Sequence, residues 1–125
     1  MAPRLERGGD GAGPLVEGYR DGGFVVEERS YRSVWLTPEA AGEWEPPAIA
    51  ELTPEHLAAP LALEPAPEFL LLGTGERLAR PPSALIAALE ERGIGVEAMD
   101  SRAAARAWSL LRAEERWIAA ALMPL

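Results

Sequence analysis

The chain has 125 residues, 48% of them apolar and 26% charged, a length and composition typical of one soluble globular domain. It has no cysteine and a single histidine, His56, which excludes disulfides, thiol nucleophiles and any metal centre built from several histidines of one chain. Its 20 acidic residues and 12 arginines give a net charge of −8, which disfavours sequence-independent binding to nucleic acid and to anionic membranes. The 23 alanines and the lack of lysine are typical of a GC-rich bacterial genome.

The N-terminal residues 1–13 are rich in glycine and lack an apolar core, which predicts a flexible tail and no signal peptide. We therefore expect one domain over residues 14–125 and a cytoplasmic protein. The longest apolar run, residues 117–123, is far shorter than the roughly 20 residues of a membrane-spanning helix, so no membrane insertion is expected.

Residues 14–37 are rich in β-branched and aromatic side chains, which predicts two or three antiparallel strands. Asp21-Gly22-Gly23 is a turn signal between two of them, and Arg29-Ser30 is a second candidate turn. Residues 38–67 hold seven of the 12 prolines, which excludes long regular elements there. A short helix is expected at about 54–59, capped by Thr53, with loop elsewhere.

From residue 68 onward, apolar strand patterns alternate with helical patterns. The sequence predicts strands at 69–72, 96–99 and 117–123, and helices from 81 to about 92 and from 101 to about 114. This order indicates an α/β domain in which helices cover a mainly parallel sheet, made mixed by the N-terminal antiparallel strands.

Two strand-to-helix junctions are the candidate ligand sites. Gly73-Thr74-Gly75 follows a predicted strand, with Arg77 shortly after it, and glycines there would let backbone amides approach an anion. The pattern lacks the third glycine of a dinucleotide fingerprint and the Gly-Lys-Ser/Thr of a phosphate-binding loop, so a plain tight turn is the alternative. Asp100-Ser101 forms the second junction, either beside the same ligand or as a simple helix cap.

No catalytic residue, metal ligand or cofactor is predicted. The carboxylate pairs are sequence neighbours that point in different directions, as expected for solvated surface, and His56 is a lone histidine in a loop region. Trp44 stands between two glutamates in the proline-rich segment. It either packs onto the domain or is presented to a partner protein.

The stretch from Met99-Asp100-Ser101 to Arg116 resembles the signature of the Mth-type domain family, and Leu71-Leu72-Gly73-Thr74-Gly75 resembles that family's Leu-Gly-Thr-Gly motif. The run from Gly18-Tyr19 to Ser33-Val34 is similar to its opening strands, so the resemblance covers about residues 15–123. That family is similar to mitochondrial complex I assembly factor 3 and to the adipogenesis-associated Mth-domain protein. The resemblance implies a three-layer α/β fold, no defined cofactor and a role in assembly through protein contacts.

The chain departs from the family pattern at several polar positions. Ser101 replaces a usual threonine, residues 107–109 (Ala-Trp-Ser) replace Thr-Tyr-Asn, and Glu115 replaces a glycine. These departures weaken an enzymatic interpretation. The favoured hypothesis is a non-enzymatic interaction protein linked to respiratory or membrane-complex assembly, with Trp44 as a candidate partner contact. The alternative is a small-molecule or anion-binding domain, or an enzyme, with its site at Gly73, Thr74, Gly75, Arg77, Asp100 and Ser101. The oligomeric state is left open.

Overall fold

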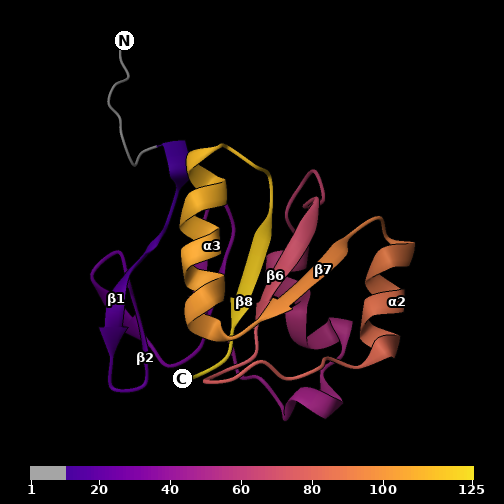
Figure 1. Ribbon diagram of the computed structural model, residues 1–125. Helices are drawn as coiled ribbons and strands as arrows, with labels where there is room; N and C mark the ends of the chain where they lie inside the picture. Colours follow the sequence, from indigo (N-terminus) through magenta and orange to yellow (C-terminus); the bar gives the residue numbers. More distant parts are fainter. Residues whose placement is uncertain (1–10) are drawn as a thin grey trace.

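The computed structural model describes residues 11–125, whose strands form two sheets (Figure 1). The smaller sheet is antiparallel, in the order β1-β2-β3, with bounds Val16–Arg20, Gly23–Val26 and Arg29–Tyr31. The larger sheet has the order β5-β4-β8-β6-β7, with bounds Ala41–Glu43, Val34–Leu36, Ala119–Leu122, Phe69–Gly73 and Gly95–Met99. In it β8, β6 and β7 are parallel, whereas β4 is antiparallel to both β8 and β5. The expected mixed α/β fold is confirmed, with the N-terminal strands divided between the two sheets.

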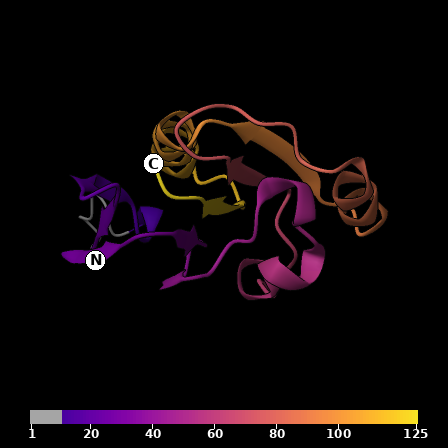
Figure 2. The ribbon, with the colours of Figure 1, turned by 90° about the horizontal axis from the view of Figure 1, so that it is seen from below.

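Helices cover both faces of the larger sheet (Figure 2). Helix α3 (Ser101–Ala113) packs on one face together with the smaller sheet. The other face is covered by α2 (Ser83–Glu91), α1 (Ala58–Leu61) and the 3-10 turns η2 (Ile49–Glu51) and η3 (Pro54–Leu57). None of the helices in residues 11–125 has both the length and the apolar character needed to cross a membrane.

The packing of strand β6 on both of its faces explains why its sequence is an uninterrupted apolar run. Side chains alternate along a strand, so Leu70 and Leu72 pack towards α1 and α2 while Leu71 packs towards α3. All three leucines are essentially inaccessible to solvent. Strand β8 runs beside β6 and carries three alanines, whose small side chains let layers pack closely against it. A strand buried on both faces is typical of parallel sheets covered by helices.

The turns of the smaller sheet correct one expectation. Asp21 and Gly22 both have positive φ, which gives the expected tight hairpin turn between β1 and β2. The second turn, however, is Glu27-Glu28, at φ 52° and 68°, and Arg29-Ser30 lies within β3. The carboxylate of Glu17 accepts hydrogen bonds from both turn amides, at 3.0 and 3.4 Å. This side chain stabilises a left-handed turn that carries no glycine, so the usual sequence signal was missing.

The proline-rich segment holds more structure than expected. Strand β5 lies within it, and the predicted helix is a 3-10 turn that continues into α1, so Pro60 falls inside a helix instead of ending one. Pro60 is in the first turn of α1, where a missing amide proton removes no helical hydrogen bond. His56 has a structural role, because its Nδ1 accepts a hydrogen bond from the Thr53 amide at 3.0 Å.

Helix α3 fastens the N-terminal segment to the domain. The indole of Trp108 donates a hydrogen bond to the Pro14 carbonyl at 2.8 Å. The buried guanidinium of Arg112 donates to the carbonyls of Gly11 and Ala12, both at 2.9 Å, and also to that of Arg116. The predicted tail over residues 1–13 lies outside the described residues for its first ten positions.

Candidate functional site

The two junctions predicted as a ligand site meet in the structure at the buried hydroxyl of Ser101. Gly75 donates its amide to Ser101 Oγ at 2.9 Å, and Ser101 Oγ donates to the Met123 carbonyl at 2.8 Å. The Ser101 amide in turn donates to the Gly75 carbonyl at 2.8 Å. Ser101 is completely buried, so one hydroxyl ties the ends of β6 and β8 to the first turn of α3.

Gly73 is required by this close approach. A Cβ atom at position 73 would lie 2.8 Å from Ser101 Oγ and 2.9 Å from both Ser101 Cα and Leu122 Cδ2. Gly75 has φ of 108°, a conformation that residues with a side chain rarely adopt. The two glycines therefore serve helix–sheet packing and the turn that follows it.

Thr74 closes the loop on itself. Its amide donates to the Met99 carbonyl at 2.9 Å, while its hydroxyl donates to the Arg77 carbonyl at 2.7 Å and accepts from the Ala79 amide at 2.9 Å. The side chain of Arg77 is exposed. The amides of Thr74 and Gly75, which a phosphate would need, thus already have partners within the chain.

Asp100 is the N-cap of α3, and its Oδ1 accepts a hydrogen bond from the Ala103 amide at 2.9 Å. This is the capping interaction predicted for the junction. Of the six residues predicted as a ligand site, five gather at this junction, and Arg77 contributes only its backbone carbonyl. Their polar groups are used mainly to hold β6, β8 and α3 together.

A groove of about 510 Å³ opens beside this junction, and we call it the Trp44 groove. It lies where β6 and β8 end and β4 begins, at the carboxyl edge of the parallel strands. Such edges are where α/β sheets usually bind ligands. The groove is lined by Arg32, Ser33, Glu43, Trp44, Glu45, Pro46, Pro47, Ala48, Ile49, Thr74, Met123 and Pro124. Only Thr74 and Trp44 of these were predicted as site residues.

Ser33 is the most informative residue of the groove that sequence reasoning missed. It is 3% exposed, and its hydroxyl has no hydrogen-bonding partner among residues 11–125. Buried hydroxyls normally have a partner, so an unpaired one in a groove wall is available to a bound molecule. The sequence held no signal for it, because the groove is assembled from four segments distant along the chain.

Trp44 packs onto the domain, which is one of the two alternatives that the sequence left open. It is 9% exposed, and its indole donates a hydrogen bond to the Leu122 carbonyl at 3.2 Å. Trp44 therefore does not project from the surface as a partner-contact residue would. Trp44 lines the Trp44 groove, so a partner that enters this groove would meet it.

The acidic residues and the histidine of the described part of the chain form no cluster suited to a metal ion. Within residues 11–125, no group of three or more histidine, aspartate or glutamate side chains is placed to hold a metal ion. Burial lowers the pKa of the Arg112 guanidinium, which the nearby Glu115 carboxylate partly offsets by raising it. Arg112 lies at the far end of α3 from the Ser101 junction, so this perturbation belongs to the anchoring of the N-terminal segment.

Comparisons with known proteins agree with this fold. Residues 16–123 match the family described as "Protein of unknown function (DUF498/DUF598)". Among solved structures, the chain is similar to a Mth938-like domain of Bordetella pertussis determined by NMR. The TM-score is 0.77 at 30% identity, covering 99% of this chain and 92% of the other.

Two curated relatives differ in how much of their length the chain spans. An uncharacterized protein of Rhodobacter capsulatus is 36% identical over 100% of this chain and 94% of its own. NADH dehydrogenase [ubiquinone] 1 alpha subcomplex assembly factor 3 of Danio rerio is 32% identical over 90% of this chain. The chain spans only 66% of that zebrafish protein and 60% of its bovine counterpart.

Proposed function

Because this chain belongs to the DUF498/DUF598 family and has the Mth938-like fold, we propose that it is an assembly-factor-like protein that binds other proteins. The observation that carries this proposal is its 32% identity to complex I assembly factor 3 over 90% of the chain. The match extends over 114 residues, about as many as the structure describes. The finer hypothesis is that its target is respiratory complex I or another membrane complex.

The hydrogen bonds at the Ser101 junction support a non-enzymatic function. The hydroxyls of Ser101 and Thr74 and the amides of Thr74 and Gly75 all have partners within the chain. A reaction at this junction would have to break contacts that join two strands to a helix. A protein that acts by binding partners at its surface would leave these hydrogen bonds intact.

The test is affinity capture of the tagged protein from gently solubilised cells, followed by mass spectrometry. We expect reproducible enrichment of subunits of one membrane complex, with complex I subunits as the specific prediction. The purified subunit is then titrated against the purified chain by calorimetry to establish direct contact. Capture of no defined set, or no heat of binding with the captured subunit, would contradict the proposal.

A second candidate function rests on the Ser33 hydroxyl in the Trp44 groove, which has no partner within residues 11–125. This candidate is binding of a small polar molecule next to the Gly73-Thr74-Gly75 loop, with Ser33 supplying a hydrogen bond. The rim carries one arginine and two glutamates, Arg32, Glu43 and Glu45, so it offers both donors and acceptors. A groove of about 510 Å³ is large enough for a metabolite.

Thermal-shift screening with carboxylate, phosphate and amine compounds tests this candidate. A true ligand raises the melting temperature of the wild type and loses most of that effect in Ser33→Ala. Ser30→Ala is the matched control, because Ser30 is exposed on β3 and does not line the groove. Equal responses of the two variants would exclude Ser33 from binding.

A further inference from the structure

A second groove lies between α3 and β1, and we call it the α3–β1 groove. It has a volume of about 300 Å³ and is lined by Val16, Tyr19, Ala105, Arg106, Ser109 and Leu110. Tyr19 and Leu110 are 41% and 68% exposed, and they are two of the three large apolar side chains found exposed among the described residues. Apolar side chains gathered in this way mark an interaction surface more often than scattered ones do.

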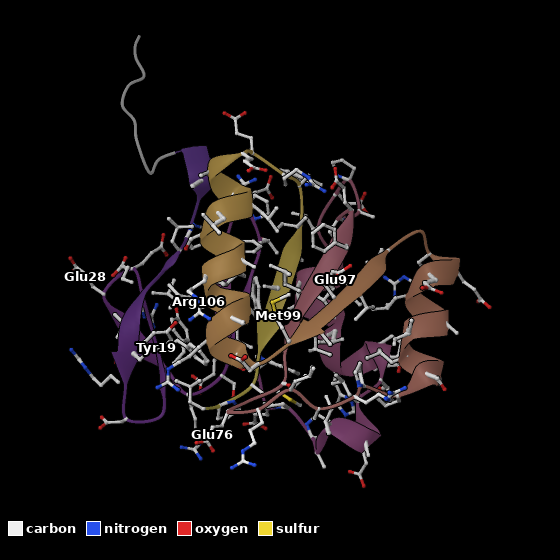
Figure 3. All side chains as sticks on the ribbon, in the orientation of Figure 1. Tyr19, Glu28, Glu76, Glu97, Met99 and Arg106 are labelled. Atoms are coloured by element: carbon white, nitrogen blue, oxygen red, sulfur yellow. The ribbon has the colours of Figure 1, made fainter. Side chains whose placement is uncertain are left out.

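The charge of this groove is opposite to that of the protein. Arg106 is the charged residue of its lining, and Arg102 lies one helical turn away with its guanidinium 5.1 Å from the centre of the Tyr19 ring. Figure 3 shows Arg106 on α3 and Tyr19 on the neighbouring small sheet. The acidic residue next to Val16 on β1 is Glu17, whose carboxylate is bound to the amides of the Glu27-Glu28 turn. The charged side chain that lines the groove is thus positive, on a chain of net charge −8.

The charged and apolar side chains of this surface follow a fixed order along α3. Arg102, Arg106 and Leu110 follow one another at intervals of four residues, and all three are exposed. Residues spaced in this way lie on one face of a helix, one above the other. The face therefore presents two positive charges in its N-terminal half and an apolar side chain in its C-terminal half.

We propose that the α3–β1 groove binds an acidic amphipathic segment of a partner protein. An apolar side chain of the segment packs against Tyr19 and Leu110, and a carboxylate pairs with Arg106. A basic segment would be repelled by the two arginines, and a purely apolar one would leave them without partners. This inference rests on the proposed function, since it names the chemistry of the partner that an assembly-factor-like protein would hold.

Two synthetic helical peptides test the groove directly. Both peptides have about four turns and the same leucine positions. The polar positions are glutamate in one peptide and lysine in the other. Fluorescence anisotropy with the full chain should show saturable binding of the glutamate peptide only. Its affinity should fall between about 50 mM and about 500 mM salt, because added ions screen the arginine–carboxylate attraction.

Matched variants assign the binding to the groove. Leu110→Ala should weaken the glutamate peptide roughly fivefold or more, as expected for loss of one apolar interface contact. Leu78→Ala is its control, because Leu78 is 65% exposed but lies outside the groove. Arg106→Glu should weaken binding roughly tenfold or more, whereas Arg92→Glu, the same charge change at the end of α2, should have little effect.

The outcomes separate this inference from the proposed function. No saturable binding, equal binding of both peptides, or equal losses in the groove variants and their controls would each overturn the groove assignment. The peptides replace the natural partner, so their result does not depend on whether affinity capture succeeds. Empty capture with intact peptide binding would count against the assembly role alone. Successful capture that Arg106→Glu and Leu110→Ala leave unchanged would count against the groove alone.

Discussion

Replacing Ser101 by alanine tests whether the junction between β6, β8 and α3 is structural. The substitution removes a fully buried hydroxyl that accepts from the Gly75 amide and donates to the Met123 carbonyl. Both backbone groups would then be buried without a partner, and each such loss costs about 1–3 kcal/mol. We therefore expect Ser101→Ala to lower the free energy of unfolding by about 2–6 kcal/mol, a large share of the roughly 5–15 kcal/mol of an ordinary domain.

The assay is urea and thermal unfolding followed by circular dichroism. For a domain of this size, a loss of this magnitude lowers the melting temperature by roughly 10 °C or more. Ser109→Ala is the matched control, because Ser109 lies on the same helix, is half-buried and makes no junction contact. A Ser101→Ala protein as stable as Ser109→Ala would refute the reasoning. The junction polar groups would then be available for ligand chemistry after all.

Three further substitutions probe the same physical account by thermal unfolding. Gly73→Ala should destabilise by about 1–3 kcal/mol, because its Cβ would overlap Ser101 and must push β6 and α3 apart. Arg112→Lys should lower the free energy of unfolding by about 1–2 kcal/mol and should speed limited proteolysis before Pro14. The reason is that a lysine ammonium cannot replace the planar guanidinium, which donates hydrogen bonds to two separate backbone segments. Glu115→Gly should stabilise by about 1 kcal/mol, because Glu115 has φ of 62°, whereas Glu115→Ala should not. An unchanged melting temperature in any of the three would contradict the contact or strain assigned to that residue.

The C-terminal half of the fold was predictable because its signals are local. Glycine, proline and capping residues bound each element there, and an apolar run such as 69–72 fits only a buried strand between helices. The family pattern at position 115 also has a structural reason. Glu115 follows the end of α3 with a left-handed backbone, and its amide bonds the Arg112 carbonyl while the Arg116 amide bonds that of Leu111. This is a Schellman motif, in which glycine is the preferred residue.

The N-terminal half was less predictable because its structure depends on distant contacts. The Glu27-Glu28 turn contains no glycine and is held by the carboxylate of Glu17, ten residues away. Strand β5 has only three residues and forms beside β4, so it is too short for an alternating apolar pattern to predict it. The N-terminal strands are divided between two sheets, and the smaller sheet packs against α3. This packing joins segments that are distant along the chain.

The candidate site divides in the same way. The meeting of Gly73-Thr74-Gly75 with Asp100-Ser101 was one of the alternatives that the sequence left open, since parallel strands bring their carboxyl ends to one edge. What the sequence could not show is that the chain itself satisfies these polar groups. Ser33 was missed because a serine at the start of a strand is unremarkable until its burial without a partner is known.

The contacts of Ser101 bear on how the departures from the family pattern should be interpreted. Ser101 replaces a usual threonine but keeps the hydroxyl that both hydrogen bonds need, so this change preserves the junction. Trp108 replaces a tyrosine, and its indole binds the Pro14 carbonyl from within the core. These two replacements thus keep or supply a hydrogen bond that holds segments together. Residues that select a partner face no such requirement, because they lie on exposed positions such as Arg106 and Leu110. A shared scaffold with different exposed side chains would let one fold hold different partners.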